Sequence, residues 1–186
     1  MEDKIAKVFV LKFDEAQKLF VEAKFSESLK KYQILLKENP QHVSVLNNIG
    51  LIYEELKNFN EAIIYYNKCY KIIPKEKTII HNLANAYCKV ERYLEALPLL
   101  KEIINLDFKN ETNHEKLALC LFYSQSKKET KNFIELAVKK FPNNKFLNGL
   151  LGKTLLHLSS HKEGIKYLQK STGLIEFNST GVKYLS

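Results

Sequence analysis

The amino-acid sequence predicts an all-α fold, an α-solenoid of about five tandem helix-turn-helix hairpins, each 34 residues long. Three observations predict this fold. The sequence resembles itself at a constant step of 34 residues, as in Pro40 and Pro74. Within each step the apolar residues recur with the period of an amphipathic helix. The chain has only six Gly and four Pro among its 186 residues, which favours long helices over a β-protein rich in turns.

The 34-residue step continues along the chain without an insertion. Several small and aromatic residues recur at it, and we expect them to be the structural residues of the repeat: Gly50, Tyr53, Ala62, Pro74, Ala84, Tyr87, Ala96, Ala118 and Gly152. The predicted array therefore fills residues 1–176, with units at about 9–42, 43–76, 77–110, 111–144 and 145–176. Residues 177–186 break the pattern and are predicted to be an extended tail or the start of a further segment.

Each unit is predicted to contain two helices. In the unit 43–76 the first apolar stripe is Leu46, Ile49, Gly50 and Tyr53, and the second is Ala62, Ile63, Tyr66 and Cys69. Pro74 ends the second helix, because proline cannot continue one. Pro98 is expected in the first turn of its helix, where the missing N–H has no intrahelical partner.

The small residues have a steric role in this interpretation. Gly50, Ala84, Ala118 and Gly152 lie where the first helix must approach the second closely. Ala62 and Ala96 have the same role on the second helix. A larger side chain at these positions is expected to push the two helices apart.

The residues just described resemble the tetratricopeptide repeat family. The unit 43–76 matches its pattern almost completely, and the resemblance covers about residues 9–176. Pentatricopeptide and other helical repeats of about 33 to 45 residues are the alternatives, which the constant period disfavours. The resemblance implies a right-handed solenoid and a protein–protein interaction scaffold or adaptor that binds an extended peptide or a partner helix.

The resemblance also implies that the first helices line a concave groove. The candidate peptide-binding residues on that side are Asn47, Asn48, His81, Asn82, Asn85 and Lys116. Asn48 and Asn82 come into register on successive helices, and an Asn amide offers both a donor and an acceptor to a peptide backbone. The carboxylate clamp that binds the C-termini of heat-shock chaperones is not expected. Among its positions at Phe13, Gln17, Asn48, Thr78 and Asn82, only the asparagine at 48 fits.

The sequence has no motif that indicates catalysis. It has no Gly-rich phosphate loop, no Gly-x-Ser-x-Gly and no Cys-x-x-Cys, so we predict no enzyme, no catalytic residue and no cofactor. His157 and His161 are four residues apart but have only Glu163 nearby, so we predict no metal site. The three cysteines are widely spaced, which favours thiols in a reducing compartment, and we expect a cytoplasmic protein. No apolar run approaches the length of a membrane span.

The charge of the chain is positive, with a formal net charge of +8, and it is uneven. Residues 109–186 contain 13 Lys and 6 Glu, a net charge of +7. Only Arg92 is arginine, whereas phosphate and base recognition draw heavily on that residue, so nucleic-acid binding is not expected. The first alternative function is a targeting module at the N-terminus of a longer enzyme. A weaker alternative is binding of an acidic partner or nucleic acid through the Lys-rich second half.

Overall fold

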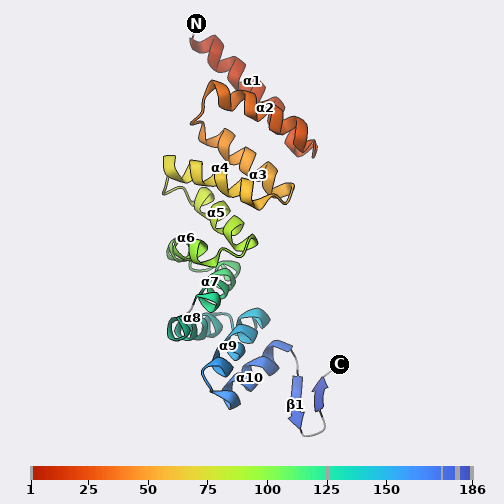
Figure 1. Ribbon diagram of the computed structural model, residues 1–186, viewed down its shortest axis with the longest axis vertical. Helices are drawn as coiled ribbons and strands as arrows, with labels where there is room; N and C mark the ends of the chain where they lie inside the picture. Colours follow the sequence, from red (N-terminus) through yellow and green to blue (C-terminus); the bar gives the residue numbers. More distant parts are fainter. Residues whose placement is uncertain (1, 125, 173, 179–180, 185–186) are drawn as a thin grey trace. The chain divides into compact units, whose positions relative to one another are not determined.

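The computed structural model describes residues 2–124, 126–172, 174–178 and 181–184 (Figure 1). Within these residues the chain forms ten helices followed by a two-stranded β-hairpin. The elements are α1 (Glu2–Val21), α2 (Phe25–Glu38), α3 (Val43–Glu55), α4 (Phe59–Ile72), α5 (Lys77–Lys89), α6 (Tyr93–Leu106), α7 (Glu111–Tyr123), α8 (Lys127–Lys140), α9 (Lys145–His157), α10 (His161–Thr172), β1 (Leu174–Asn178) and β2 (Gly181–Tyr184). The predicted all-α helical repeat fold is confirmed.

The chain divides into two compact units, Met1–Arg92 and Tyr93–Ser186. In the first unit, α1 packs on α2, α2 on α3, α3 on α4, and α4 on α5. In the second unit the same order holds from α6 to α10, and α10 also contacts β1. Each helix therefore buries its apolar stripe on its neighbours in the sequence, as a repeat architecture requires. The limits predicted for the individual repeat units stay a prediction.

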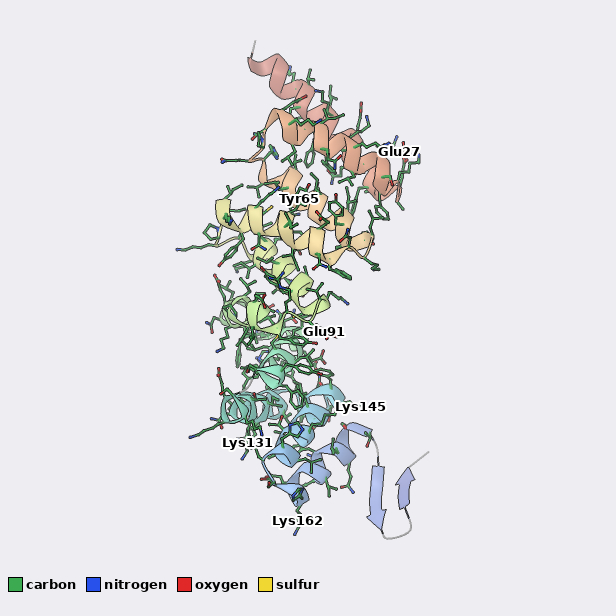
Figure 2. The ribbon with its side chains drawn as sticks, viewed as in Figure 1. Glu27, Tyr65, Glu91, Lys131, Lys145 and Lys162 are labelled. Carbon is green, nitrogen blue, oxygen red and sulfur yellow. The ribbon has the colours of Figure 1, made fainter. Side chains whose placement is uncertain are left out.

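The turn inside a hairpin is built in one way at four places. At each of them a residue other than glycine has a positive φ, close to 60°. These residues are spaced by 34 or 68 positions, and they are Ala23, Lys57, Glu91 and Ser159. At the second of these turns, Lys57 N–H donates to the carbonyl of Glu54 at 2.9 Å, and Asn58 N–H donates to that of Tyr53 at 2.8 Å. This pair of bonds is a Schellman motif, which ends a helix in the left-handed conformation. Figure 2 labels Glu91 at the third turn.

The first helix of a hairpin begins with a side-chain cap. His42 accepts a hydrogen bond from Val45 N–H at 3.3 Å at the start of α3. The N-cap residues 34, 68 and 102 positions later also accept through their side chains, and they are Glu76, Asn110 and Asn144. Such caps satisfy donors that the first turn of a helix leaves unpaired. The repeat thus fixes where its first helices begin.

The small residues allow very close contact between the helices of a hairpin. A Cβ added to Gly50 would lie 2.8 Å from Cδ1 of Tyr66, and closer still to its Cε1. A Cβ added to Gly152 would lie 2.7 Å from Cγ of Leu168 and 2.9 Å from the carbonyl oxygen of Gly164. The close contact between α3 and α4 is therefore between a glycine and an aromatic ring. Between α9 and α10 it is between the two backbones.

Two features differ from the sequence interpretation. Pro98 is the sixth residue of α6, so our placement of it in the first turn is wrong. At that position the missing N–H deprives the carbonyl of Leu94, four residues earlier, of its helical partner. At the other end, β1 and β2 pair as antiparallel strands, with Phe177 opposite Val182. The stretch called a tail thus contributes to a β-hairpin that already begins at Leu174.

Candidate peptide-binding surface

A pair of asparagine side chains connects two first helices of the first unit. Nδ2 of Asn82, on α5, donates a hydrogen bond of 3.0 Å to Oδ1 of Asn47, on α3. Both residues are half-buried. We call these two residues the asparagine bridge. It lies between helices of successive hairpins, which is where the sequence predicted a shared surface.

The asparagine bridge keeps hydrogen-bonding capacity for a ligand. An Asn amide has two N–H donors and an oxygen that accepts two hydrogen bonds. The bridge uses one donor of Asn82 and one acceptor position of Asn47. A donor on Asn47 Nδ2 and an acceptor on Asn82 Oδ1 remain, and this pair complements the C=O and N–H of a peptide backbone.

Asn48 makes a side-chain contact that the sequence did not indicate. Its Nδ2 donates a hydrogen bond of 2.7 Å to the hydroxyl of Tyr32 on α2. Tyr32 is completely buried, and burial raises the pKa of its hydroxyl. A buried tyrosine hydroxyl requires a partner. Asn48 therefore holds α3 against α2, whereas Asn82 bonds to α3, so these two residues are not equivalent.

Two other buried tyrosines show the same requirement. The hydroxyl of Tyr87 accepts from Nδ2 of Asn67 at 3.0 Å, and the hydroxyl of Tyr66 donates to Oε2 of Glu54 at 2.9 Å. Burial, with Glu54 close by, raises the pKa of Tyr66. The sequence did not indicate these pairs. The signal available was the recurrence of Tyr in the apolar stripes, because each such ring buries a polar atom.

The remaining candidates divide between the two units. His81 and Asn85 lie on α5 beside Asn82, and both are half-buried. Lys116 lies on α7, in the second unit. The structure thus brings together Asn47 and Asn82 by a direct bond, with Asn48 next to them in the chain.

Two further properties of the described residues concern metal binding and membrane insertion. No group of three His, Cys, Asp or Glu side chains that could hold a metal ion occurs among them. The ring of His157 stacks on Phe122 at 5.6 Å between centroids, and His161 begins α10. In the same part of the chain, no helix is both long and apolar enough to cross a membrane.

Comparison with known families agrees with the repeat geometry. Residues 43–76 and residues 78–106 each match a model described as tetratricopeptide repeat. These segments contain the hairpin of α3 and α4 and the helices α5 and α6. Residues 43–76 and 78–106 are therefore tetratricopeptide repeats, and this fold is typically a non-catalytic scaffold for protein interactions.

A similar protein matches half of the chain. The BBSome complex member BBS4 homolog of Drosophila melanogaster is 31% identical over 94 residues, which is 50% of this chain. This chain spans only 19% of the length of that relative.

Solved structures of similar fold cover more of the chain. A crystal structure of MamA protein matches with a TM-score of 0.78 and 18% identity, covering 90% of this chain and 92% of its own. A structure of YrrB matches with a TM-score of 0.79 and 16% identity, covering 87% of this chain and 84% of its own. A structure of MamA from Desulfovibrio magneticus RS-1 has a TM-score of 0.76 and 16% identity, covering 89% of this chain and 93% of its own. At these identities the likeness concerns the fold.

Proposed function

We propose that the protein is an interaction scaffold that binds an extended peptide of a partner protein across α3 and α5. The asparagine bridge is the observation that carries this proposal. Its remaining donor and acceptor can bind the C=O and N–H of a peptide backbone, whatever the side chains of that peptide are. His81 and Asn85 supply further polar groups on α5, and Asn48 supports the surface by bonding α3 to Tyr32 on α2.

The energetics of such a surface are suited to a reversible complex. A net contribution of about 0.5–1.5 kcal/mol is typical of one hydrogen bond made in place of bonds to water. Two backbone hydrogen bonds at the asparagine bridge would therefore change the affinity about five- to hundredfold. The rest of the binding energy has to come from apolar side chains of the peptide. This division lets the bridge set the direction of the bound chain while neighbouring contacts set its sequence.

Two of the similar proteins support a role in protein assembly. The structure of YrrB is described as a TPR protein with an unusual peptide-binding site. The Drosophila relative is described as a member of the BBSome complex. We propose by extension that this chain acts within a multi-protein assembly, without catalysing a reaction of its own. A cytoplasmic location is part of the same proposal, in keeping with the thiols Cys69, Cys88 and Cys120.

Affinity capture from the native cell tests the proposal. The immobilised parent protein is compared with a variant that carries Asn47→Ala and Asn82→Ala, and retained proteins are quantified by mass spectrometry. Asn105→Ala with Asn132→Ala is a matched control, because both residues are exposed on second helices. We expect at least one protein to be retained by the parent and the control but lost from the bridge variant. Identical retention by all three proteins would contradict the proposed surface.

A further inference from the structure

A groove lies between two second helices of the first unit, away from the asparagine bridge. It has a volume of about 900 Å³, and its walls come from α2, the turn after α2, and α4. The lining residues are Lys30, Gln33, Ile34, Leu36, Lys37, Pro40 and Lys68. We call it the α2–α4 groove.

The floor of the α2–α4 groove is apolar. Ile34 is 52% exposed, which is a large solvent contact for an aliphatic side chain in the middle of a helix. Leu36 is half-buried and packs against the core cluster of Leu46, Cys69 and Ile79. The floor is therefore firm, because it is the outer side of the packed core. A partner that covers Ile34 gains the burial of apolar surface.

The rim of the α2–α4 groove is basic. Three of its lining residues are lysines, and none of them is acidic. Lys68 lies over the ring of Tyr65, with Nζ 4.7 Å from the ring centroid, which favours its position at the edge of the groove. Figure 2 labels Tyr65 on α4.

Two carboxylates, one on α2 and one on α1, already pair with lysines that do not line the groove. Glu38 pairs with Lys12, and Glu15 pairs with Lys31 at 2.7 Å. Lys30 and Lys37, by contrast, take part in neither pair and are exposed on the groove side of α2. The local positive charge is thus larger than the small net charge of the N-terminal half would indicate.

The second unit supplies an internal comparison. A groove of about 670 Å³ lies between α6 and α8, at the same place in the repeat. There Lys101, which is 68 positions after Gln33, forms an ion pair of 2.7 Å with Glu129. A groove between second helices therefore occurs in both units, whereas the all-basic rim is a property of the α2–α4 groove.

We propose that the α2–α4 groove binds an amphipathic helix of a protein partner, with acidic residues on both sides of an apolar stripe. The stripe covers Ile34 and Leu36, and the acidic residues face Lys30, Lys37 and Lys68. Lys30 and Lys37 are seven residues apart on one helix, a distance of about 10 Å, so the contact spans about two turns of the partner. The apolar floor between the lysines favours a helix over nucleic acid, because a phosphate backbone gains nothing from covering Ile34. This docking surface is independent of the asparagine bridge.

The probe for this proposal is a display library of 18-residue helical peptides. Its members carry a fixed leucine stripe, and the flanking positions vary among Glu, Lys, Gln and Ala. The library is selected on the full chain and counter-selected on a variant with Lys30→Glu, Lys37→Glu and Lys68→Glu. A matched variant with Lys101→Glu, Lys128→Glu and Lys139→Glu has the same total charge but leaves the α2–α4 groove unchanged. Enriched peptides are then titrated by fluorescence anisotropy against the parent and both variants at two salt concentrations.

We expect the enriched peptides to carry Glu on both sides of the stripe. Their affinity should fall about tenfold or more in the α2–α4 variant and about twofold or less in the matched variant, and it should weaken with salt. The Asn47→Ala and Asn82→Ala variant should bind these peptides as the parent does. No enrichment, enrichment without acidic flanks, or an equal loss in the two charge variants would overturn the proposal. Self-association of the parent that the α2–α4 variant loses would assign the groove to a second copy instead, and would also overturn it.

Discussion

Replacing Gly50 by alanine tests the close contact between α3 and α4. The new methyl group would lie 2.8 Å from Cδ1 of Tyr66, closer than carbon atoms approach without a shift. Tyr66 is fully buried and its hydroxyl donates to Glu54 at 2.9 Å, so the ring cannot move without losing packing or that bond. Overpacking costs about 1–3 kcal/mol, and loss of the hydrogen bond about 1 kcal/mol more. Alanine returns about 1 kcal/mol through its higher helix propensity.

The expected net loss in the free energy of unfolding is about 2 kcal/mol, or a fall of about 4–8 °C in Tm for a chain of this size. The assay is urea and thermal unfolding followed by circular dichroism. Gly149→Ala is a matched control on α9, where the added Cβ would meet only Ser171, at 3.2 Å from Oγ. That control should raise the free energy of unfolding, by no more than about 1 kcal/mol.

A second substitution makes the test more specific. The buried cluster of the second unit contains Ala118 and Ile134, which occupy the repeat positions of Gly50 and Tyr66. In a Tyr66→Ile background, Gly50→Ala should therefore cost at least about 1 kcal/mol less than in the parent. If Gly50→Ala proves as stable as the parent, or costs the same in both backgrounds, the steric reasoning for the small residues is refuted.

Three other predictions concern single residues. Lys57→Gly should stabilise the protein by about 1 kcal/mol in urea unfolding, because Lys57 has a φ of 60° that glycine adopts without strain. His114→Leu should change the free energy of unfolding by less than about 1 kcal/mol in the same assay, because leucine removes a buried Nε2 that has no hydrogen-bond partner within the described residues but also removes the 2.8 Å contact of Nδ1 with the carbonyl oxygen of Asn110. Burial raises the pKa of the Cys69 thiol to about 11 from its ordinary value near 9. The unfolded chain therefore loses this proton first, so the free energy of unfolding should fall by about 2 kcal/mol between pH 9 and pH 11, and the fall should be smaller in Cys69→Ala.

The sequence predicted the repeat because the information is local and periodic. Gly50, Ala62 and Pro74 mark close contacts and a helix end that depend on residues within one unit. The turns inside the hairpins were less visible, because the residues with positive φ are Ala23, Lys57, Glu91 and Ser159 and none is glycine. Their conformation follows from the hydrogen bonds that end each helix, and those bonds do not depend on the identity of the side chain.

The candidate site was predicted only in part. Periodicity placed Asn47 and Asn82 on the first helices, but it does not give the rotation that turns one amide towards the other. It also did not indicate that Asn48 supports Tyr32, because that bond depends on how closely α2 approaches α3. The position of Pro98 was wrong because the start of a helix is uncertain by a few residues in any reading of a pattern. The β-hairpin at Leu174 follows no repeat position, so the 34-residue step carries no information about it.

Calorimetric titration of the captured partner's peptide is the most direct measurement of the central claim. The peptide is titrated against the parent and against the variant with Asn47→Ala and Asn82→Ala. Circular dichroism first checks that both proteins unfold at similar urea concentrations. Loss of the asparagine bridge should weaken binding about five- to hundredfold. Equal affinities for two equally folded proteins would contradict a peptide-binding surface across α3 and α5.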